Sequence, residues 1–261
     1  MELGLHGLHV LITGGSKGIG FACAEAFCKE GARVSLIARN QTGLDEAVAR
    51  LDKLGAQSQG IAADLTIAEQ ASRAIESIYQ NFGRVDVLVN CAGGATRTPF
   101  NELSPQAWHD AMQAKFFTYI HAIDPVIKKM AQHGKGVIIN VVGVGGKVAS
   151  PTHLAGGSAN AALMLASVGL ASAYGPRGVR VNVINPGLTM TDRLGKGLNA
   201  EARLQQISLE EVLAKHQQRL PLGRIAEPRE VADAVTFLSS DKASYITGAV
   251  IAMDGAASST V

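Results

Sequence analysis

A chain of 261 residues, 47% of them hydrophobic and 18% charged, is long enough to bury a large core, and its length suits one α/β domain. The net charge of +2 gives no indication of nucleic-acid binding, and no apolar run reaches membrane-spanning length. The N-terminus has no charged segment followed by a long apolar run, and the three cysteines have no metal or redox spacing. We therefore expect a cytoplasmic protein without a bound metal.

The first predicted element is a strand that ends at Thr13 and leads into a glycine-rich turn. The residues from Phe21 to Cys28 then have helical apolar spacing. Glycine allows a tight turn, and the free N–H groups at the start of a helix favour an anion. The sequence therefore predicts a cradle for a diphosphate group. The residues assigned to it are Gly14, Ser16, Lys17, Gly18, Ile19 and Gly20.

Strands and helices then alternate along the chain. We expect strands at Val34–Ala38, Gly60–Ala63, Val85–Asn90, Val137–Val142, Val179–Ile184 and Ala249–Met253, with helical patterns that include Gln106–Gln132, His153–Tyr174 and Pro228–Ser239. Such alternation predicts a parallel sheet covered on both faces. One long insertion, Thr189–Leu220, has an irregular or weakly helical pattern and is placed where a substrate lid can lie.

The end of the second strand indicates which dinucleotide fits the cradle. An acidic residue there selects NAD, whereas a basic one can hold the 2′-phosphate of NADP. Here Ile37-Ala38-Arg39-Asn40 carries no carboxylate, and Lys17 adds a second positive charge. We therefore predict NADP, with NAD as the alternative. The alternative interpretation of Arg39 and Lys17, which we favour less, is two solvated surface cations.

Four motifs occur in a fixed order along nearly the whole chain. They are Thr13-Gly14-x-x-x-Gly18-x-Gly20, Asn90-Cys91-Ala92-Gly93, Arg180-Val181-Asn182-x-x-x-Pro186-Gly187, and Ile246-Thr247-Gly248 with Asp254-Gly255. Together they resemble the short-chain dehydrogenase/reductase family, with one change in its Asn-Asn-Ala-Gly motif. The resemblance implies a single doubly wound Rossmann domain with strand order 3-2-1-4-5-6-7, a nicotinamide cofactor, and a homotetramer or homodimer with an interface on the helices around 106–132 and 153–174.

The resemblance also assigns cofactor contacts outside the glycine-rich turn. Asp64 is implied to meet the adenine, and Thr191 the nicotinamide amide. The remaining positions assigned to cofactor binding are Leu65, Asn90, Ala92, Gly93, Asn160, Pro186 and Gly187.

The family's four catalytic side chains are absent from the positions where the resemblance places them. The helix Asn falls on Lys115, the Ser on Gly143, and the Tyr and Lys on Gly156 and Asn160, thirteen and seventeen residues after Gly143. General acid–base catalysis contributes about 10²–10⁴-fold, and glycine has no side-chain proton to give. The usual mechanism does not carry over. We expect the two glycines to leave volume beside the nicotinamide, for a bulkier ligand or water.

Three side chains are candidates for a relocated acid or base. Lys115 can change its pKa when buried, although it equally well replaces the missing lysine only electrostatically. Lys147 follows the fifth strand, where an exposed loop cation is the simpler interpretation. His153 precedes the altered helix and is either a site residue or a helix-start residue satisfied by backbone. Tyr119, one helical turn from Lys115, is interpreted as a packed aromatic.

Three functions remain open from the sequence. The first is a divergent NADP(H)-dependent oxidoreductase that acts on a small carbonyl or alcohol compound by a non-standard mechanism. The second is a lyase or hydrolase on the same fold, and the third is a non-catalytic nucleotide-binding protein. Family resemblance favours the first. Asp192 and Arg193 follow Thr191 and either line the lid or form a salt bridge within it.

Overall fold

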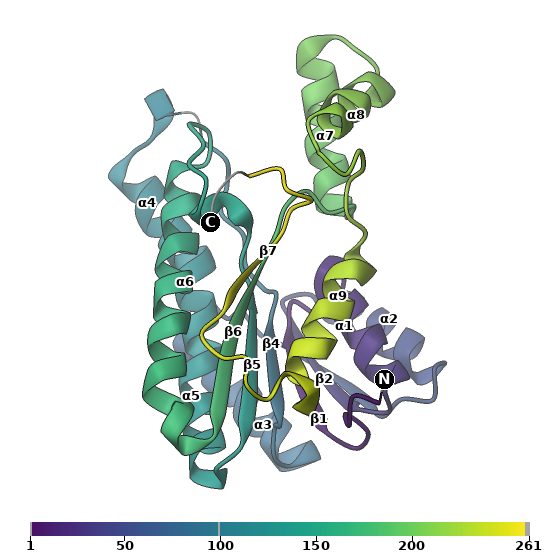
Figure 1. Ribbon diagram of the computed structural model, residues 1–261, viewed down its shortest axis with the longest axis vertical. Coiled ribbons are helices and arrows are strands. Elements are labelled where there is room, and N and C mark those ends of the chain that lie inside the picture. The colour runs from purple at the N-terminus through teal and green to yellow at the C-terminus, as the bar shows by residue number, and fades with distance from the viewer. Residues whose placement is uncertain (1, 99, 259–261) are drawn as a thin grey trace.

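A seven-stranded parallel sheet forms the centre of the protein (Figure 1), in the order β3-β2-β1-β4-β5-β6-β7. The structure is a computed structural model that describes residues 2–98 and 100–258. Its strands are β1 (His9–Thr13), β2 (Arg33–Ala38), β3 (Ser58–Ala62), β4 (Val87–Asn90), β5 (Gly136–Val141), β6 (Val179–Pro186) and β7 (Val250–Met253). Every neighbouring pair is parallel. The predicted fold class and strand order are confirmed.

Helices cover both faces of the sheet. They are α1 (Gly18–Lys29), α2 (Gln41–Asp52), α3 (Ala68–Phe82), α4 (Pro105–Ala111), α5 (Thr118–His133), α6 (Leu154–Tyr174), α7 (Asp192–Gln205), α8 (Leu209–Gln218) and α9 (Pro228–Ser239). Helices α1 and α9 pack together on one face, and α3, α5 and α6 cover the other (Figure 1). Strands β1, β4 and β5 are buried along their whole length, which explains why their sequences read as continuous apolar runs.

The predicted helix Gln106–Gln132 is interrupted. A π-helical turn, Met112–Phe117, joins α4 to α5, and the chain stays helical through it. The hydroxyl of Thr118 lies 3.2 Å from the carbonyl oxygens of Gln113 and Ala114 and donates to them. This side chain satisfies carbonyls that the regular helical pattern leaves open. The apolar periodicity continues across the turn, so the sequence pattern does not reveal it.

The insertion predicted as irregular or weakly helical contains two regular helices, α7 and α8, which stand apart from the sheet in Figure 1. Ser208 and Glu211 form a capping box at the start of α8. Leu198, Ala202 and Val212 bury a small apolar cluster between the two helices. The sequence indicates only an irregular or weakly helical segment, because the buried positions are few and widely spaced, and the structure shows that the helical alternative holds.

The chain enters and leaves this insertion at the same point. The backbone N–H of Met190 donates to Ala226 (2.8 Å), and the N–H of Ala226 donates to Leu188 (3.2 Å). A single bridge pairs Thr189 with Ala226 in parallel orientation. The two helices therefore form an arm whose base is closed by backbone hydrogen bonds.

Helix α6, despite the glycines near its start, is regular from Leu154 onward. It is long and apolar enough, by length and composition alone, to span a membrane, and it is the one such helix in the described part of the chain. It lies against β6 and buries residues on its inner side, including Leu163, Met164 and Ala171. Its apolar composition is explained by this packing.

At the opposite end of the sheet, His9 is fully buried in a chain of hydrogen bonds. Its Nδ1 lies 3.0 Å from the carbonyl oxygen of Arg84, which can only accept, so Nδ1 carries the proton. Its Nε2 lies 2.8 Å from the hydroxyl of Ser35, which accepts from the amide of Gln59 and donates to the ring. Burial lowers the pKa of His9, and the network fits a neutral imidazole.

We expect His9 to make the protein less stable in mild acid. Because its pKa is lower in the folded than in the unfolded state, its contribution is complete above about pH 6.5 and is lost as the pH falls below that value. Urea unfolding between about pH 7.5 and about pH 5.5 should show a smaller loss of unfolding free energy in His9→Gln than in the wild type. The exposed His133→Gln is the control. Equal losses in the wild type and His9→Gln would contradict this role.

Candidate functional site

The carboxyl ends of the central strands are tied together by polar side chains. Thr13 Oγ1, at the end of β1, donates to Asn90 Oδ1 (3.2 Å) and accepts from the backbone N–H groups of Cys91 and Ala92. Asn90 Nδ2 donates to Asn140 Oδ1 on β5 (2.9 Å). Sheets of this kind bind ligands at the carboxyl ends of their strands. The predicted site residues gather at this edge.

The glycine-rich turn has the backbone that the sequence predicts. Gly14 and Gly18 have φ values of 68° and 59°, in the left-handed region that glycine adopts easily. A Cβ on Gly14 would lie 2.8 Å from the backbone nitrogen of Ala92, so the turn packs closely on the loop after β4. Lys17 is the N-cap of α1 and makes no side-chain capping bond, so it does not occupy the first N–H groups of the helix. The other turn residues are half-buried Ser16 and Ile19 and buried Gly20.

The segment after β6 lies over this turn. A Cβ on Gly18 would lie 3.4 Å from the Cγ2 of Thr191, which places Thr191 against the start of α1. Pro186 ends β6, and a Cβ on Gly187 would lie 2.9 Å from the Cα of Asp254. The structure therefore brings these three predicted cofactor positions to the same edge as the glycine-rich turn.

Arg39 is exposed directly after β2. The next residue, Asn40, caps α2 by accepting from the backbone N–H of Gly43 (2.6 Å). A Cβ on Gly43 would lie 3.9 Å from the Cβ of Ser16, so the start of α2 lies beside the glycine-rich turn. The segment that follows Arg39 and the turn that carries Lys17 are therefore neighbours in the structure.

Asp64 lies after β3, near Arg39. Its Oδ1 accepts from the backbone N–H (2.9 Å) and the hydroxyl (2.8 Å) of Thr66. Burial opposes ionisation of Asp64, but these hydrogen bonds and the charge of Arg39 outweigh it and lower the pKa of its carboxyl. The neighbouring Leu65 is buried, and its carbonyl oxygen lies 2.9 Å from Nδ1 of His121.

Lys115 lies in the π-helical turn between α4 and α5. A Cβ on Gly93 would lie 2.5 Å from the carbonyl oxygen of Ala114, so this turn touches the loop after β4. The Nζ of Lys115 donates to the hydroxyl of Tyr119 (3.1 Å) and lies 4.7 Å from the centre of its ring. Tyr119 in turn donates to the carbonyl oxygen of Val141, the last residue of β5 (2.6 Å). Tyr119, predicted as a packed aromatic, is fully buried and also positions Lys115.

The environment of Lys115 changes its acidity. Burial of the ammonium, together with the positive charge of Arg193, lowers the pKa of Lys115 to about 8. Burial raises the pKa of Tyr119 well above its usual value, so its phenol keeps its proton. An ammonium with a pKa of about 8 can give up a proton, and the amine can accept one, close to neutral pH.

The imidazole of His153 fills the space above Gly156. A Cβ on Gly156 would overlap Cε1 of His153 and lie 2.8 Å from both His153 Nδ1 and the Cβ of Ala95. The expectation that Gly156 leaves an empty volume was therefore wrong. His153 Nδ1 is buried and has no hydrogen-bond partner in the described part of the chain. Burial, and then the charges of Arg97, Arg193 and Lys115, lower the pKa of His153 and favour the neutral ring.

Asn160 is buried one turn further along α6. Its Nδ2 donates to the carbonyl oxygen of Gly143 (3.2 Å), and its Oδ1 is buried without a hydrogen-bond partner among the described residues. A Cβ on Gly157 would lie 2.7 Å from the carbonyl oxygen of Gly145, so the loop after β5 packs directly on α6. Lys147 ends this loop, half-buried, and it is not among the charges that act on His153.

Arg193 joins the cluster from α7. Its Nη2 donates to the carbonyl oxygen of Ala95 (3.4 Å), and its guanidinium lies where a Cβ on Gly94 would be. Of the three acid–base candidates, the structure thus places Lys115 and His153 in one electrostatic cluster with Arg193, and leaves Lys147 outside it. Sequence analysis placed Arg193 only in the lid, because nothing in the local pattern indicates which loop a long side chain reaches.

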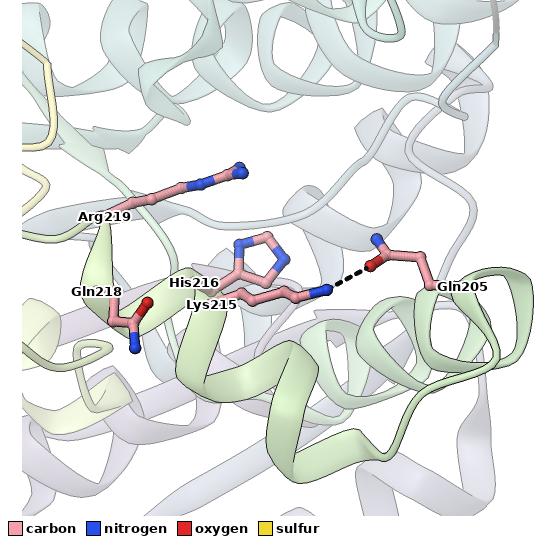
Figure 2. A pocket seen from close by; sticks show the side chains of 5 residues that line it. All are labelled: Gln205, Lys215, His216, Gln218 and Arg219. Atoms are coloured by element: carbon pink, nitrogen blue, oxygen red, sulfur yellow. Dashed lines mark hydrogen bonds between the residues drawn. The ribbon is translucent and has the colours of Figure 1, made fainter.

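A separate pocket of about 350 Å³ lies in the arm formed by α7 and α8. Figure 2 shows the side chains that line it, which are Gln205, Lys215, His216, Gln218 and Arg219. Lys215 Nζ donates to Gln205 Oε1 across it (3.2 Å). None of the predicted site residues lines this pocket.

Comparison with known proteins identifies the family. Residues 14–257 match the family described as enoyl-(acyl carrier protein) reductase. The chain belongs to the short-chain dehydrogenase/reductase family. It is 36% identical to 2-(S)-hydroxypropyl-CoM dehydrogenase 3 of Xanthobacter autotrophicus, over 94% of each chain. It is 33% identical to a 3-oxoacyl-[acyl-carrier-protein] reductase of Vibrio cholerae, over 97% of this chain and 98% of the relative.

Solved structures of short-chain dehydrogenases/reductases have the same fold. L-sorbose reductase from Gluconobacter frateurii, in complex with NADPH and L-sorbose, has a TM-score of 0.95 and 30% identity over the whole of both chains. An actinorhodin polyketide ketoreductase variant with NADPH has a TM-score of 0.93 and 26% identity, covering 97% of this chain and 98% of the other. The relatives are named dehydrogenases and reductases, so the predicted family of NAD(P)-dependent oxidoreductases is confirmed.

Proposed function

We propose that the protein is an NADP(H)-dependent oxidoreductase that acts on a small carbonyl or alcohol compound, with Lys115 as its proton donor or acceptor. The observation that carries this proposal is the half-buried Lys115, whose ammonium is bonded to Tyr119 and whose pKa is lowered to about 8, at the edge of the sheet that bears the glycine-rich turn. In this proposal the chain is a divergent member of its family, with Lys115, Gly143, Gly156 and Asn160 at the usual catalytic positions.

The cofactor proposal rests on how the residues of this edge fit a dinucleotide phosphate. The uncapped start of α1 and the positive φ of Gly14 and Gly18 suit a diphosphate. Arg39 and Lys17 offer two positive charges for a 2′-phosphate, and no carboxylate follows β2 directly. The NADPH complexes of related reductases support the same choice. The predicted contacts of Asp64, Leu65, Asn90, Ala92, Gly93, Pro186, Gly187 and Thr191 are part of this proposal.

In the proposed mechanism, NADPH held at this edge by the glycine-rich turn and Arg39 would supply the hydride for carbonyl reduction. The ammonium of Lys115 donates a proton to the carbonyl oxygen, and in the reverse reaction its amine accepts the alcohol proton. Tyr119 holds the Lys115 side chain through its hydroxyl, which is itself fixed on Val141. The unpartnered Oδ1 of Asn160 accepts a hydrogen bond from a ribose hydroxyl, without the charge of a lysine.

His153 and Lys147 have different roles in this proposal. Burial lowers the pKa of His153, which touches Gly156, and its unpartnered Nδ1 can accept a hydrogen bond from a substrate hydroxyl. No geometric observation favours Lys147 over Lys115 as the acid–base group. We propose Lys115 as the acid–base group, His153 as a substrate contact and Lys147 as a loop cation near the site.

We also propose that the insertion 189–220 acts as a substrate lid. Its base is closed by the bonds of Met190 and Leu188 to Ala226, and its Arg193 reaches the loop after β4. We propose a homotetramer or homodimer, because Leu165 and Val168 are 76% and 40% exposed on the outer side of α6. We also propose a cytoplasmic location, which the free cysteines Cys23, Cys28 and Cys91 support.

Reversing the charge of Arg39 tests the preference for NADP over NAD. In Arg39→Asp we expect NADPH affinity to fall by at least about tenfold, because a carboxylate repels the 2′-phosphate, whereas NADH affinity changes little. Calorimetric titration with both cofactors measures this. Arg73→Asp, an equal charge change at an exposed position on α3, is the control. Equal losses for both cofactors, or no binding of either to the wild type, would contradict the proposal.

The reaction is tested by following NADPH consumption with a panel of small ketones and aldehydes. Consumption that depends on one class of carbonyl compound supports the oxidoreductase. Conversion of a compound without oxidation of NADPH would instead establish lyase or hydrolase chemistry. Binding of NADPH without consumption over the whole panel would establish a nucleotide-binding protein.

A further inference from the structure

The site contains several positive charges from different parts of the chain. Lys115 comes from the π-helical turn, Arg193 from the start of the arm and Arg97 from the loop after β4. Arg193 is bonded to Ala95 on that loop, and the loop is joined to the segment before α6 by a hydrogen bond from the Thr98 N–H to the Thr152 carbonyl (3.1 Å). These contacts bring Arg97, Arg193 and Lys115 close enough to His153 to act on its charge.

No described carboxylate balances these charges. The charged or ionisable groups that act on Lys115 are Arg193 and Cys91, and those that act on His153 are Arg97, Arg193 and Lys115. In the described part of the chain, neither Lys115 nor Arg193 forms an ion pair with Asp or Glu. Like charges held together at a partly buried position destabilise one another, and a bound anion removes that repulsion.

The orientation of Arg193 leaves part of its guanidinium available. One nitrogen, Nη2, donates to the Ala95 carbonyl oxygen, and the guanidinium occupies the space that a Cβ on Gly94 would fill. The remaining donors of its planar fork are suited to the two oxygens of a carboxylate or phosphate. The ammonium of Lys115 keeps two hydrogens beyond the one that it gives to Tyr119.

We propose that the substrate carries an anionic group, a carboxylate or a phosphate, which pairs with Arg193 and Arg97 beside Lys115. This inference rests on the proposed function, because it describes the substrate of the same site. The reacting carbonyl or alcohol then lies on the Lys115 side of the anion, and His153 Nδ1 is free to accept a hydrogen bond from a neighbouring hydroxyl. Short oxo acids, hydroxy acids and phosphorylated carbonyl compounds fit this description.

The diphosphate of the cofactor is a second source of negative charge near Arg193, since Thr191 lies against the start of α1. The test therefore uses protein already saturated with NADPH. Malonate and inorganic phosphate serve as anionic probes, and malonamide is the uncharged counterpart of malonate. Affinities are measured by calorimetry in the wild type and in Arg193→Gln, with Arg97→Gln as a second variant on a different segment.

We expect malonate or phosphate to bind the NADPH complex, malonamide to bind at least about tenfold more weakly, and Arg193→Gln to lose at least about tenfold in anion affinity. A preference for malonate identifies a carboxylate, and a preference for phosphate a phosphorylated substrate. Arg219→Gln, which removes a cation from the pocket of Figure 2, should leave the affinity unchanged. Melting temperatures confirm that each variant is folded.

Two results would overturn the inference. One is equal affinity for malonate and malonamide. The other is anion binding that Arg219→Gln weakens and that Arg193→Gln and Arg97→Gln leave intact, which would place the anion in the arm. Failure of the proposed function is distinguishable, because it would appear as absent NADPH binding in the first titration. Anion binding to the free protein that still depends on Arg193 would then support the anion site alone.

Discussion

Replacing Lys115 with methionine is expected to lower the turnover number by at least about a hundredfold, because general acid–base catalysis contributes about 10²–10⁴-fold. Methionine keeps most of the length of the side chain and removes the ammonium. The hydroxyl of Tyr119 retains its bond to Val141, so the fold around it should survive. NADPH affinity and melting temperature should therefore stay nearly unchanged, and turnover of a carbonyl substrate is the measurement.

The pH profile distinguishes a proton donor from a positioning charge. With a pKa of about 8, Lys115 is protonated at neutral pH and loses its proton as the pH rises through that value. Carbonyl reduction by the wild type should therefore decline above about pH 8, and the residual activity of Lys115→Met should lack that decline. Lys53→Met, at an exposed position after α2, is the matched control. Intact turnover with lowered stability in Lys115→Met would show that Lys115 only braces the site.

Adding one methyl group at Gly156 is expected to destabilise the protein by about 1–3 kcal/mol, the usual cost of overpacking. The new Cβ would overlap the ring of His153 and lie 2.8 Å from the Cβ of Ala95. Within a helix, alanine is otherwise favoured over glycine by up to about 1 kcal/mol. Urea unfolding of Gly156→Ala measures the net effect.

Gly169 offers a matched comparison in the same helix. A Cβ there meets nothing within 4 Å, so Gly169→Ala should stabilise the protein or leave it unchanged. Removing the ring in His153→Ala/Gly156→Ala should recover part of the loss, which a double-mutant cycle measures. If Gly156→Ala is as stable as Gly169→Ala, His153 does not hold the space above Gly156.

The parallel sheet and the glycine-rich turn could be predicted because backbone geometry limits which residues fit, whereas the strand order was implied by the family resemblance. Gly14 and Gly18 need positive φ, and the buried strands need continuous apolar runs. The turn and the strands can therefore be recognised from the local sequence. The motifs after β4 and β6 can likewise be recognised in short stretches of sequence. Asp64 closely follows β3 and Asn90 ends β4, so both lie at the carboxyl edge of the sheet, where the family motifs put them.

The contacts between distant segments could not be predicted in this way. His153 lies over Gly156, Tyr119 holds Lys115, and Arg193 reaches Ala95 from the arm. Each depends on the direction of one side chain across two packed elements, which has no periodicity in the sequence. The π-helical turn was hidden for a related reason. Its apolar positions continue the helical pattern, and only the hydroxyl of Thr118 marks the change in hydrogen bonding.

The closed base of the α7–α8 arm makes the arm a segment that can be replaced during evolution. Because Leu188 and Met190 are bonded to Ala226, the chain leaves the sheet and returns to it at one point, whatever lies between. Lengthening or replacing a segment whose ends are already fixed costs little conformational entropy, roughly 0.6 kcal/mol for each doubling of length. The sheet and its cofactor edge can therefore stay constant while the arm diversifies. On the proposed lid role of the arm, relatives of this chain can acquire new substrates by changing this one segment.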